Sequence, residues 1–332
     1  MKAIVYEKYG PPDVLRLREV DQPVPTDQQA LLRVCATSVN AADLHMLRGD
    51  PFLVRLEFGL NKPKKSTLGL DVAGVVDAIG SGVTQFKPGD EVFGHVSSSG
   101  YGGCAEYACA GAKHLALKPR NIAFGQAAAV PVACFTALQA LRDHGHIRAG
   151  QKVLINGASG GVGTFAVQLA RHFGADVTAT CSSRNVEMVR SLGAQQVIDY
   201  TREDVTKRGQ RYELILACNG YHSLPAYRRC LSENGIYVCA GGTMPQIFQA
   251  LLLGRLASKV WAHPMGAMLA KPDHEDLLLL RDLLESGTLV PVISACFPFS
   301  RAVEAFRYLD EGHAQGKAVI VMDPRAEKWT SQ

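Results

Sequence analysis

Runs of basic residues are missing from this chain. Its 35 lysines and arginines and 31 acidic residues leave a net charge of +4, and nowhere do five basic residues follow one another. The longest apolar stretch, residues 127–141, contains Pro131 and is shorter than the roughly 20 residues that cross a bilayer. Such a sequence supports neither nucleic acid nor a membrane as the main partner, and we expect neither.

Paired cysteines are missing as well. The nine cysteines are odd in number and scattered, and no Cys-x-x-Cys spacing occurs among them. This pattern argues against a disulfide framework and indicates free thiols in a reducing compartment. Residues 1–10 alternate like a strand and lack the apolar core of a secretory signal. We therefore expect a cytoplasmic protein.

What remains is an ordinary globular composition. Apolar residues make up 47% and charged residues 20% of the 332 residues. These fractions exclude disorder, collagen and coiled coil for the chain as a whole. At roughly 150 residues per domain, the length allows about two domains.

The first third of the chain is rich in predicted strands, which are separated by turn signals such as Lys87-Pro88-Gly89-Asp90. The strands are expected at residues 1–6, 29–37, 70–79 and 91–95. Several short strands with Gly and Pro turns between them predict a compact barrel.

After about residue 121, strands and helices alternate. Strands are expected at residues 152–156, 176–180, 196–198, 212–217 and 235–240, and helices at 126–143, 162–173 and 185–192. This alternation predicts a doubly wound parallel sheet. This regular alternation ends near residue 262. Beyond it, helices are expected near residues 275–285 and 301–310 and strands near 290–295 and 317–321.

A glycine-rich turn lies between the predicted strand 152–156 and the predicted helix 162–173. Its residues are Gly157, Ala158, Ser159, Gly160, Gly161, Val162 and Gly163. Glycines allow a tight turn and a close approach of backbone to a pyrophosphate, and the helix N-terminus offers free N–H groups to the anion. A glycine-rich turn without a ligand is the alternative, but strand, turn and helix together predict a dinucleotide site.

The end of the next strand indicates which nucleotide binds. An NAD site usually has an acidic residue there, which holds the ribose 2′-hydroxyl. This chain instead has Ser182, Ser183 and Arg184, while Asp176 lies at the other end of the strand. Two hydroxyls and a guanidinium suit a 2′-phosphate, so we expect NADPH. Arg184 as a solvated residue at a helix start is the alternative.

Several segments resemble one protein family. They are MKAIVYEKYGPPDVLRLREV at 1–20, ATSVNAADLHMLRG at 36–49, LGLDVAGVVDAIGSGVTQFKPGDEVFG at 68–94, VLINGASGGVGTFAVQLAR at 153–171 and GHAQGKAVIV at 312–321. With them, the chain resembles the medium-chain dehydrogenase/reductase superfamily, and most closely its zinc-free, ζ-crystallin-like quinone oxidoreductase branch.

The resemblance implies an α/β fold in which a Rossmann sheet is inserted into a GroES-like β-barrel catalytic domain. We expect the catalytic domain at residues 1–122, the NADP(H)-binding domain at 123–262 and a C-terminal return to the catalytic domain at 263–332. The resemblance also implies further cofactor contacts at Thr136, Tyr200, Asn219, Gly241, Gly242 and Lys317. Tyr200 as a strand cap and Lys317 as a surface lysine are the alternatives.

Zinc ligands are replaced at the positions where zinc members of the superfamily carry them. These positions have Asn40, Leu70 and approximately Val132, which cannot supply the thiolate and imidazole set of such a site. The four-cysteine lobe of a structural zinc is also absent from the sequence. We therefore expect no metal.

Without zinc ligands, fewer classes of hydride acceptor are expected. Hydride transfer to a simple ketone forms an alkoxide about as basic as hydroxide, the anion of water with its pKa of about 15.7. A quinone gives a phenolate-type anion nearer the value of about 10 for tyrosine. The gap of roughly six pKa units corresponds to about 8 kcal/mol, so quinones and activated enones are the easier acceptors without a Lewis acid.

Few residues are candidates for contact with the acceptor. Asn40 is a candidate hydrogen-bond partner of the acceptor oxygen, and Asp43 could hold a water or orient a neighbour. A turn asparagine and a helix-capping aspartate are the alternatives. Residues 51–60, rich in Phe and Leu, are expected to shape the acceptor pocket.

The expected function is NADPH-dependent, metal-independent hydride transfer to a quinone or activated enone. Two alternatives stay open: a zinc-free alcohol or aldehyde dehydrogenase-like enzyme, and a non-catalytic NADPH-binding protein. The resemblance further implies a homodimer, for which residues 259–265 are a candidate edge.

Overall fold

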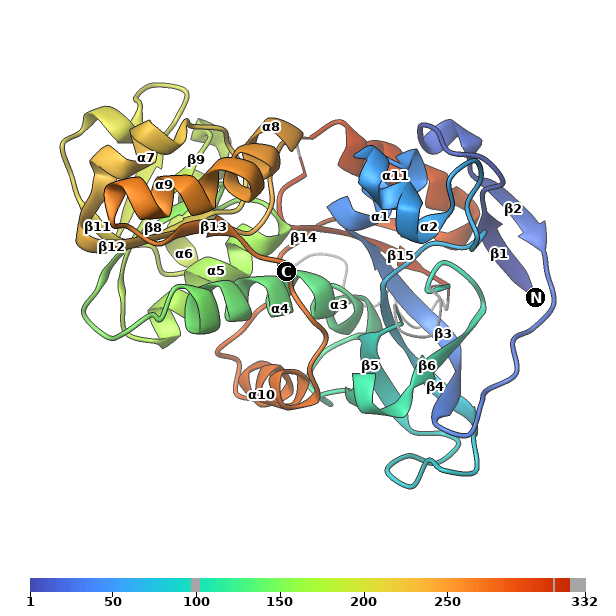
Figure 1. Ribbon diagram of the computed structural model, residues 1–332. Coiled ribbons are helices and arrows are strands. Elements are labelled where there is room, and N and C mark those ends of the chain that lie inside the picture. Colours follow the sequence, from blue (N-terminus) through green and yellow to red (C-terminus); the bar gives the residue numbers. More distant parts are fainter. Residues whose placement is uncertain (97–101, 313, 323–332) are drawn as a thin grey trace. The chain divides into compact units, whose positions relative to one another are not determined.

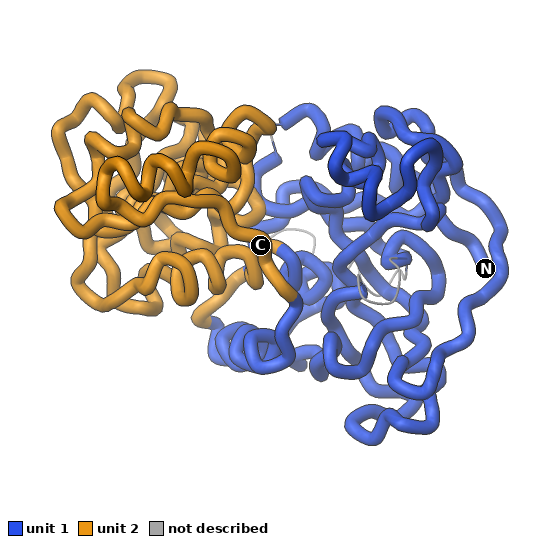
Figure 2. The backbone as a smooth tube through the Cα atoms, viewed as in Figure 1, with its two compact units in different colours: residues 1–132, 272–287, 291–332 blue, residues 133–271, 288–290 orange. Residues whose placement is uncertain are grey.

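The computed structural model describes residues 1–96, 102–312 and 314–322 (Figure 1). The chain divides into two compact units (Figure 2). Unit 1 comprises residues 1–132, 272–287 and 291–332, and unit 2 comprises residues 133–271 and 288–290. The middle of the chain therefore forms one unit, while both ends of the chain contribute to the other.

Unit 1 is built around a seven-stranded, mainly antiparallel sheet with the order β14-β15-β3-β4-β5-β7, in which β6 also pairs with β3. The strands are β3 (Gln29–Val39), β4 (Asp71–Ile79), β5 (Glu91–His95), β6 (Tyr107–Gly111), β7 (Leu115–Leu117), β14 (Ile293–Pro298) and β15 (Lys317–Val321). β1 (Lys2–Val5) and β2 (Arg16–Glu19) form a separate hairpin sheet. Register shifts in β3 at Leu31/Leu32 and Val34/Ala36 bend this long strand, which pairs with three neighbours.

Helices and short 3₁₀ turns surround this sheet. They are η1 (Pro12–Val14), α1 (Ala41–Arg48), α2 (Phe52–Phe58), η3 (Ala112–His114), α3 (Phe124–Ala128), α10 (His274–Glu285), η8 (Phe299–Arg301) and α11 (Ala302–Asp310). One core cluster packs Leu47, Leu68 and Phe306 together with the strand residue Ile320. The C-terminal strand β15 therefore completes a core that the N-terminal segments began.

Unit 2 contains a six-stranded parallel sheet with the order β10-β9-β8-β11-β12-β13. Its strands are β8 (Lys152–Asn156), β9 (Asp176–Cys181), β10 (Gln196–Asp199), β11 (Tyr212–Ala217), β12 (Leu231–Cys239) and β13 (Met265–Ala267). Numbered within the sheet, this is the order 3-2-1-4-5-6 of a Rossmann fold, so the predicted doubly wound sheet is confirmed.

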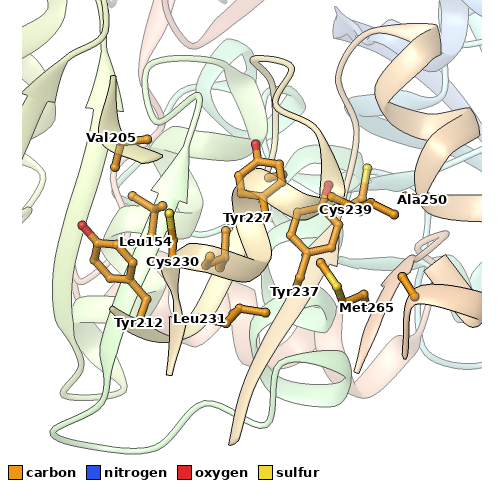
Figure 3. Close-up of a cluster of buried hydrophobic side chains, with 14 of the residues drawn as sticks. Leu154, Val205, Tyr212, Tyr227, Cys230, Leu231, Tyr237, Cys239, Ala250 and Met265 are labelled. Atoms are coloured by element: carbon orange, nitrogen blue, oxygen red, sulfur yellow. The ribbon is translucent and has the colours of Figure 1, made fainter. Parts of the chain in front are cut away.

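The helical segments of unit 2 connect these strands. They are α4 (Pro131–Gln139, which begins at the end of unit 1), the π-helical η4 (Ala140–His144), α5 (Gly161–His172), η5 (Ser183–Asn185), α6 (Val186–Ser191), η6 (Val205–Lys207), α7 (Leu224–Cys230), α8 (Met244–Phe248), the π-helical η7 (Gln249–Leu253) and α9 (Gly254–Trp261). Tyr227 of α7 packs on Tyr237 of β12 with ring centroids 4.7 Å apart (Figure 3). These large buried rings anchor α7 to the sheet.

Three local predictions need correction. The single helix expected at 126–143 is divided into α3, α4 and η4, and Pro131 begins α4 because proline fits the first turn of a helix. Residues 52–58 form the helix α2, which was not predicted. The helices α8 and α9 were not predicted, although the four-residue spacings of Leu256 with Val260 and of Arg255 with Lys259 are a helical pattern in α9.

The unit boundaries also differ from the expected domain boundaries. The division falls after residues 132 and 271, where the sequence predicted 122 and 262. α3 belongs to unit 1, and β13 extends the parallel sheet of unit 2 by pairing with β12. In the part of the chain that the structure describes, no helix is long and apolar enough to cross a membrane.

Candidate functional site

The glycine-rich turn connects β8 to α5, as the sequence predicts. Gly157 has φ +82°, and an added Cβ would lie 2.7 Å from the backbone nitrogen of Asn219. A Cβ on Gly163 would lie 2.7 Å from the Cα of Ala158, so α5 lies directly against the turn. The first turn of α5 carries no acidic side chain, and its N-cap Gly160 makes no side-chain hydrogen bond. The helix N-terminus can therefore receive an anion.

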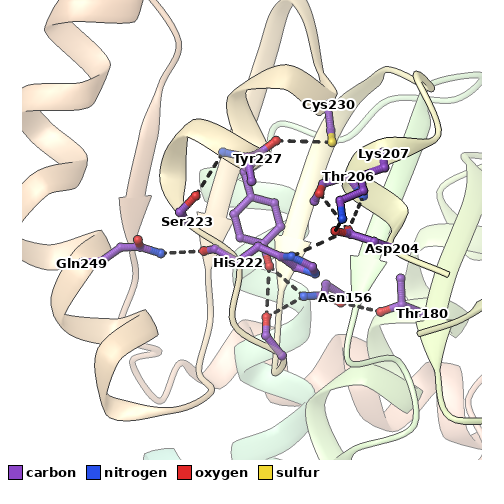
Figure 4. A network of polar contacts seen from close by, with 12 residues as sticks. Asn156, Thr180, Asp204, Thr206, Lys207, His222, Ser223, Tyr227, Cys230 and Gln249 are labelled. Atoms are coloured by element: carbon purple, nitrogen blue, oxygen red, sulfur yellow. Dashed lines mark hydrogen bonds and ion pairs between the residues drawn. The ribbon is translucent and has the colours of Figure 1, made fainter. Parts of the chain in front are cut away.

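A buried polar network that the sequence did not reveal supports this turn (Figure 4). Asn156 Nδ2 donates to the Gly220 carbonyl and to the Tyr227 hydroxyl, both at 2.7 Å, and Thr180 Oγ1 donates to Asn156 Oδ1. The Gly157 N–H in turn donates to Thr180 Oγ1 at 3.1 Å. The signals in the sequence are polar residues at or near the carboxyl ends of β8 and β9, namely Asn156 and Thr180. The network ties β8, β9 and α7 together beneath the turn.

Parallel pairing brings the carboxyl ends of the strands to one edge of the sheet. In the register, Asn156 pairs with Thr180 and Ala217, Cys181 with Asp199, and Ala217 with Cys239. The candidate cofactor residues that directly follow these ends therefore share this edge. They are Gly157, Ser159, Gly160, Gly161, Val162, Gly163, Ser182, Ser183, Arg184, Tyr200, Asn219, Gly241 and Gly242.

A carboxylate lies among the residues expected to bind the 2′-phosphate. The Ser183 hydroxyl donates to Asp199 Oδ2, and the Thr201 hydroxyl donates to Asp199 Oδ1 at 2.7 Å. These hydrogen bonds lower the pKa of Asp199. Asp199 ends the neighbouring strand β10 and was not predicted at this site, because only the parallel register brings it beside the strand end at 181–184. Arg184 and Tyr200 are exposed beside it, Tyr200 by 62%.

Gly163→Ala is expected to weaken NADPH binding about tenfold, or about 1.4 kcal/mol. The added methyl group meets backbone atoms of the turn, which cannot move aside as a side chain can. Overpacking of this kind costs about 1–3 kcal/mol. Titration of the cofactor's fluorescence measures the affinity. Gly266→Ala, with no atom within 4 Å of its added Cβ, is the matched control, and equal affinities for the two variants would contradict the prediction.

Asp71 of β4 is the centre of a buried polar cluster in unit 1. Ser38 Oγ donates to Asp71 Oδ2 at 2.6 Å, Asn40 Nδ2 donates to the same oxygen at 2.8 Å, and the Val132 N–H donates to Oδ1 at 2.9 Å. The Lys317 ammonium lies 3.6 Å from Oδ2. Asp71 is fully buried, so this group of donors replaces its lost hydration.

Lys317 extends from β15 into this cluster. Its ammonium donates to Asn40 Oδ1 and, at 3.3 Å, to the Val39 carbonyl, and the residue is only 3% exposed. Burial lowers the pKa of Lys317, and the carboxylates of Asp71 and Asp43 oppose that shift. The alternative of a surface lysine is therefore wrong. Because Asn40 Oδ1 accepts from Lys317, its Nδ2 group must face Asp71.

Asp43 and Asn40 are both placed by the start of α1. Asn40 is the N-cap, and its N–H donates to Asp43 Oδ2 at 2.9 Å, while the Gly69 N–H donates to Asp43 Oδ1 at 3.0 Å. Asp43 thus makes the helix-capping contact that was the alternative interpretation. It is completely buried, and burial raises its pKa to about 7.

The titration of Asp43 gives a stability difference that depends on pH. Between pH 3.8, the ordinary pKa of an aspartate, and about pH 7, the folded chain holds a proton that the unfolded chain has released. The folded state then binds more protons, so the unfolding free energy of the wild type minus that of Asp43→Asn should fall as pH rises through this window and level off above it. Urea unfolding at stepped pH measures this difference. A difference that rises with pH would contradict the raised pKa.

Two other predicted positions are Thr136 and residues 51–60. Thr136, expected near the cofactor, is on α4 of unit 2 and is 9% exposed. In residues 51–60, Phe52, Leu53, Leu56 and Leu60 are all exposed by more than half. Their apolar side chains are available to an apolar acceptor, while their role stays a prediction.

Residues 26–120 match the family described as "Alcohol dehydrogenase GroES-like domain", and residues 192–320 match "Zinc-binding dehydrogenase". The chain is 36% identical to the "NADPH-dependent alkenal/one oxidoreductase, chloroplastic" of Arabidopsis thaliana, covering 98% of this chain and 80% of that protein. It is also 36% identical to the "Chloroplast envelope quinone oxidoreductase homolog" of the same plant, covering 96% and 98%.

A solved structure of a quinone oxidoreductase is also similar to this chain. The quinone oxidoreductase from Coxiella burnetii matches with a TM-score of 0.85 and 32% sequence identity, covering 97% of this chain and 99% of that one. The likeness therefore extends over both units, in sequence and in fold.

Proposed function

Since this chain belongs to the quinone oxidoreductase branch of the medium-chain dehydrogenase/reductase superfamily, we propose that it transfers a hydride from NADPH to a quinone or an activated enone. The observation that carries the proposal is the strand–turn–helix at residues 152–172, set on a Rossmann sheet. The names of the relatives, an NADPH-dependent alkenal/one oxidoreductase and quinone oxidoreductases, support the choice of acceptor and cofactor.

Unit 2 supplies the cofactor-binding residues in this proposal. NADPH, when bound, supplies the hydride. The backbone N–H groups of Gly160–Gly163 and the N-terminus of α5 bind its pyrophosphate. Ser182, Ser183, Arg184 and Tyr200 hold the adenosine 2′-phosphate, and the guanidinium provides the positive charge that a phosphate needs.

Asn40 is the proposed contact of the acceptor oxygen. Its Nδ2 group has two N–H bonds, and Asp71 accepts from one of them. The second can donate to the oxygen on which negative charge develops. Lys317 and Asp71 are positioning residues, because together they hold both ends of the Asn40 amide. Asp43 fixes the backbone of Asn40 through its N–H.

The residues present do not fit the zinc that the family description implies. Asn40 and Leu70 occupy expected ligand positions, and Leu70 packs in the apolar core of unit 1. Lys317 already places a cation beside Asp71. Among the described residues, no three His, Cys, Asp or Glu side chains gather in a way that could hold a metal. We therefore propose metal-independent chemistry and derive no step through zinc.

The test follows NADPH oxidation by chelator-treated protein with an ortho-quinone, with an enone as a second acceptor. Turnover that survives chelation and favours NADPH over NADH would support the proposal. NADPH binding without turnover of any quinone, enone or alcohol would replace it with a cofactor-binding role. Alcohol oxidation with NADP⁺, without quinone or enone turnover, would indicate the dehydrogenase alternative.

A homodimer and a reducing, cytoplasmic location are further parts of the proposal. β13 pairs only with β12 and leaves one edge free in the described sheet, while residues 259–261 of the expected edge belong to α9. The nine cysteines are all free thiols, as a reducing compartment requires. Light scattering tests the dimer, and a fluorescent fusion to the chain tests the location.

A further inference from the structure

The helical segment 244–261 exposes six of its large apolar side chains, while Ile247 and Trp261 pack against the core. Phe248, Leu252, Leu256 and Val260 follow one another at four-residue spacing and are 38–71% exposed. Leu251 and Leu253 are also exposed by more than half. We call these six residues the apolar face. Single exposed apolar residues are ordinary, but a contiguous face marks an interaction surface.

The part of the same segment that lies directly against β13 contains small residues. Ala250, Gly254 and Ala257 are buried, and an added Cβ on Gly254 would lie 2.8 Å from the Met265 carbonyl oxygen. The helices therefore lie tightly against β13, and the leucines are not needed for that packing. Replacing them with polar residues should leave the unit folded.

The sequence around the apolar face contains basic residues and no acidic ones. No Asp or Glu occurs from residue 234 to residue 272, while Arg255, Lys259 and Lys271 lie within it. Arg255 and Lys259 are exposed on the segment, beside Leu251, Leu252, Leu256 and Val260 in sequence. An exposed apolar helix face bordered by arginine and lysine suits the boundary between the headgroups and acyl chains of an anionic bilayer.

A second copy of the chain fits this surface less well. A two-fold contact places the same patch on both sides. Both copies would then contribute Arg255 and Lys259 to one contact, with no carboxylate from residues 234–272 to neutralise them. Anionic lipid supplies the opposite charge to both residues.

We propose that the apolar face is a peripheral membrane-binding surface, which inserts into an anionic leaflet while Arg255 and Lys259 contact the headgroups. This goes beyond the proposed function and does not depend on it. It also departs from the expectation of no membrane partner. That expectation rested on spanning length and on basic runs, whereas surface binding needs only one face of a helical segment.

Co-sedimentation of the full chain with vesicles tests the proposal. Vesicles of phosphatidylcholine with phosphatidylserine should bind the protein, those of phosphatidylcholine alone should bind it much less, and added salt should release it. Leu252→Ser with Leu256→Ser, and separately Arg255→Glu with Lys259→Glu, should each lower the partition coefficient more than tenfold. Leu17→Ser, on β2 of unit 1, and Arg190→Glu, on α6, are the matched controls.

Each other result is decisive. A wild-type chain that does not sediment with anionic vesicles overturns the proposal, and so do variants that bind as the wild type does. A leucine pair variant that changes the mass in light scattering but not the vesicle binding would assign the face to a second copy. Circular dichroism and NADPH titration of the same variants confirm that they are folded.

Discussion

Asp71→Ala is expected to lower the free energy of unfolding by about 3–5 kcal/mol, the usual cost of leaving one member of a buried ion pair without its partner. The Lys317 ammonium then keeps Asn40 and the Val39 carbonyl but loses its carboxylate, in a place where it is 3% exposed. Ser38 and the Val132 N–H lose their acceptor as well. Urea denaturation followed by circular dichroism measures the change.

The double variant distinguishes charge from packing. Asp71→Ala with Lys317→Met removes both charges, so it should be less destabilised than the sum of the two single variants. Asp13→Ala, which breaks the exposed pair with Arg307, is the control and should change stability little. Additive single effects, or an Asp71 variant as stable as the Asp13 variant, would show that Lys317 and Asp71 are not coupled.

Arg184→Ala is expected to raise the KM for NADPH by roughly one to two orders of magnitude and to leave that for NADH nearly unchanged. A hydrogen bond to a charged group contributes about 1.5–3 kcal/mol, and about 1.4 kcal/mol corresponds to a tenfold change. NADH has no 2′-phosphate for the guanidinium to bind. Steady-state kinetics with both cofactors give the ratio of the two KM values.

The matched control for this variant is Arg190→Ala. Arg190 is an exposed arginine of α6 that pairs with Glu187, and its loss should change neither KM. Equal effects of Arg184→Ala on the two cofactors would remove Arg184 from the phosphate site. The carboxylate of Asp199 beside Ser183 adds a further check, since Asp199→Asn removes a negative charge and should favour NADPH.

The sequence predicts best those elements that are determined by residues within a few positions of one another. The helix expected at 162–173 is observed at Gly161–His172, because an apolar stripe and a glycine-rich start both act within a few residues. The strands 152–156 and 212–217 are confirmed at the same residues. They lie at the centre of a sheet covered on both faces, where continuous apolar runs are required.

Prediction failed where residues distant in the chain decide the outcome. Asp199 lies in the neighbouring strand from Ser183, and only the parallel register brings them together. Asp71 and Lys317 lie in different strands of unit 1, and β3 separates β4 from β15 in the sheet. Asn40 was singled out by its place at a zinc-ligand position, and Lys317 by the family resemblance. Neither feature indicated that the two side chains would bond to each other.

The position of Lys317 in the last described strand also has a consequence for synthesis on the ribosome. Asp71 and Asp43 leave the exit tunnel early, while the lysine that neutralises the cluster follows more than 240 residues later. All of residues 133–271 can fold into unit 2 during this interval. The carboxylates of Asp71 and Asp43 must stay hydrated until residue 317 has been made, so we expect nascent chains stopped before residue 317 to have a protease-resistant middle and a sensitive beginning.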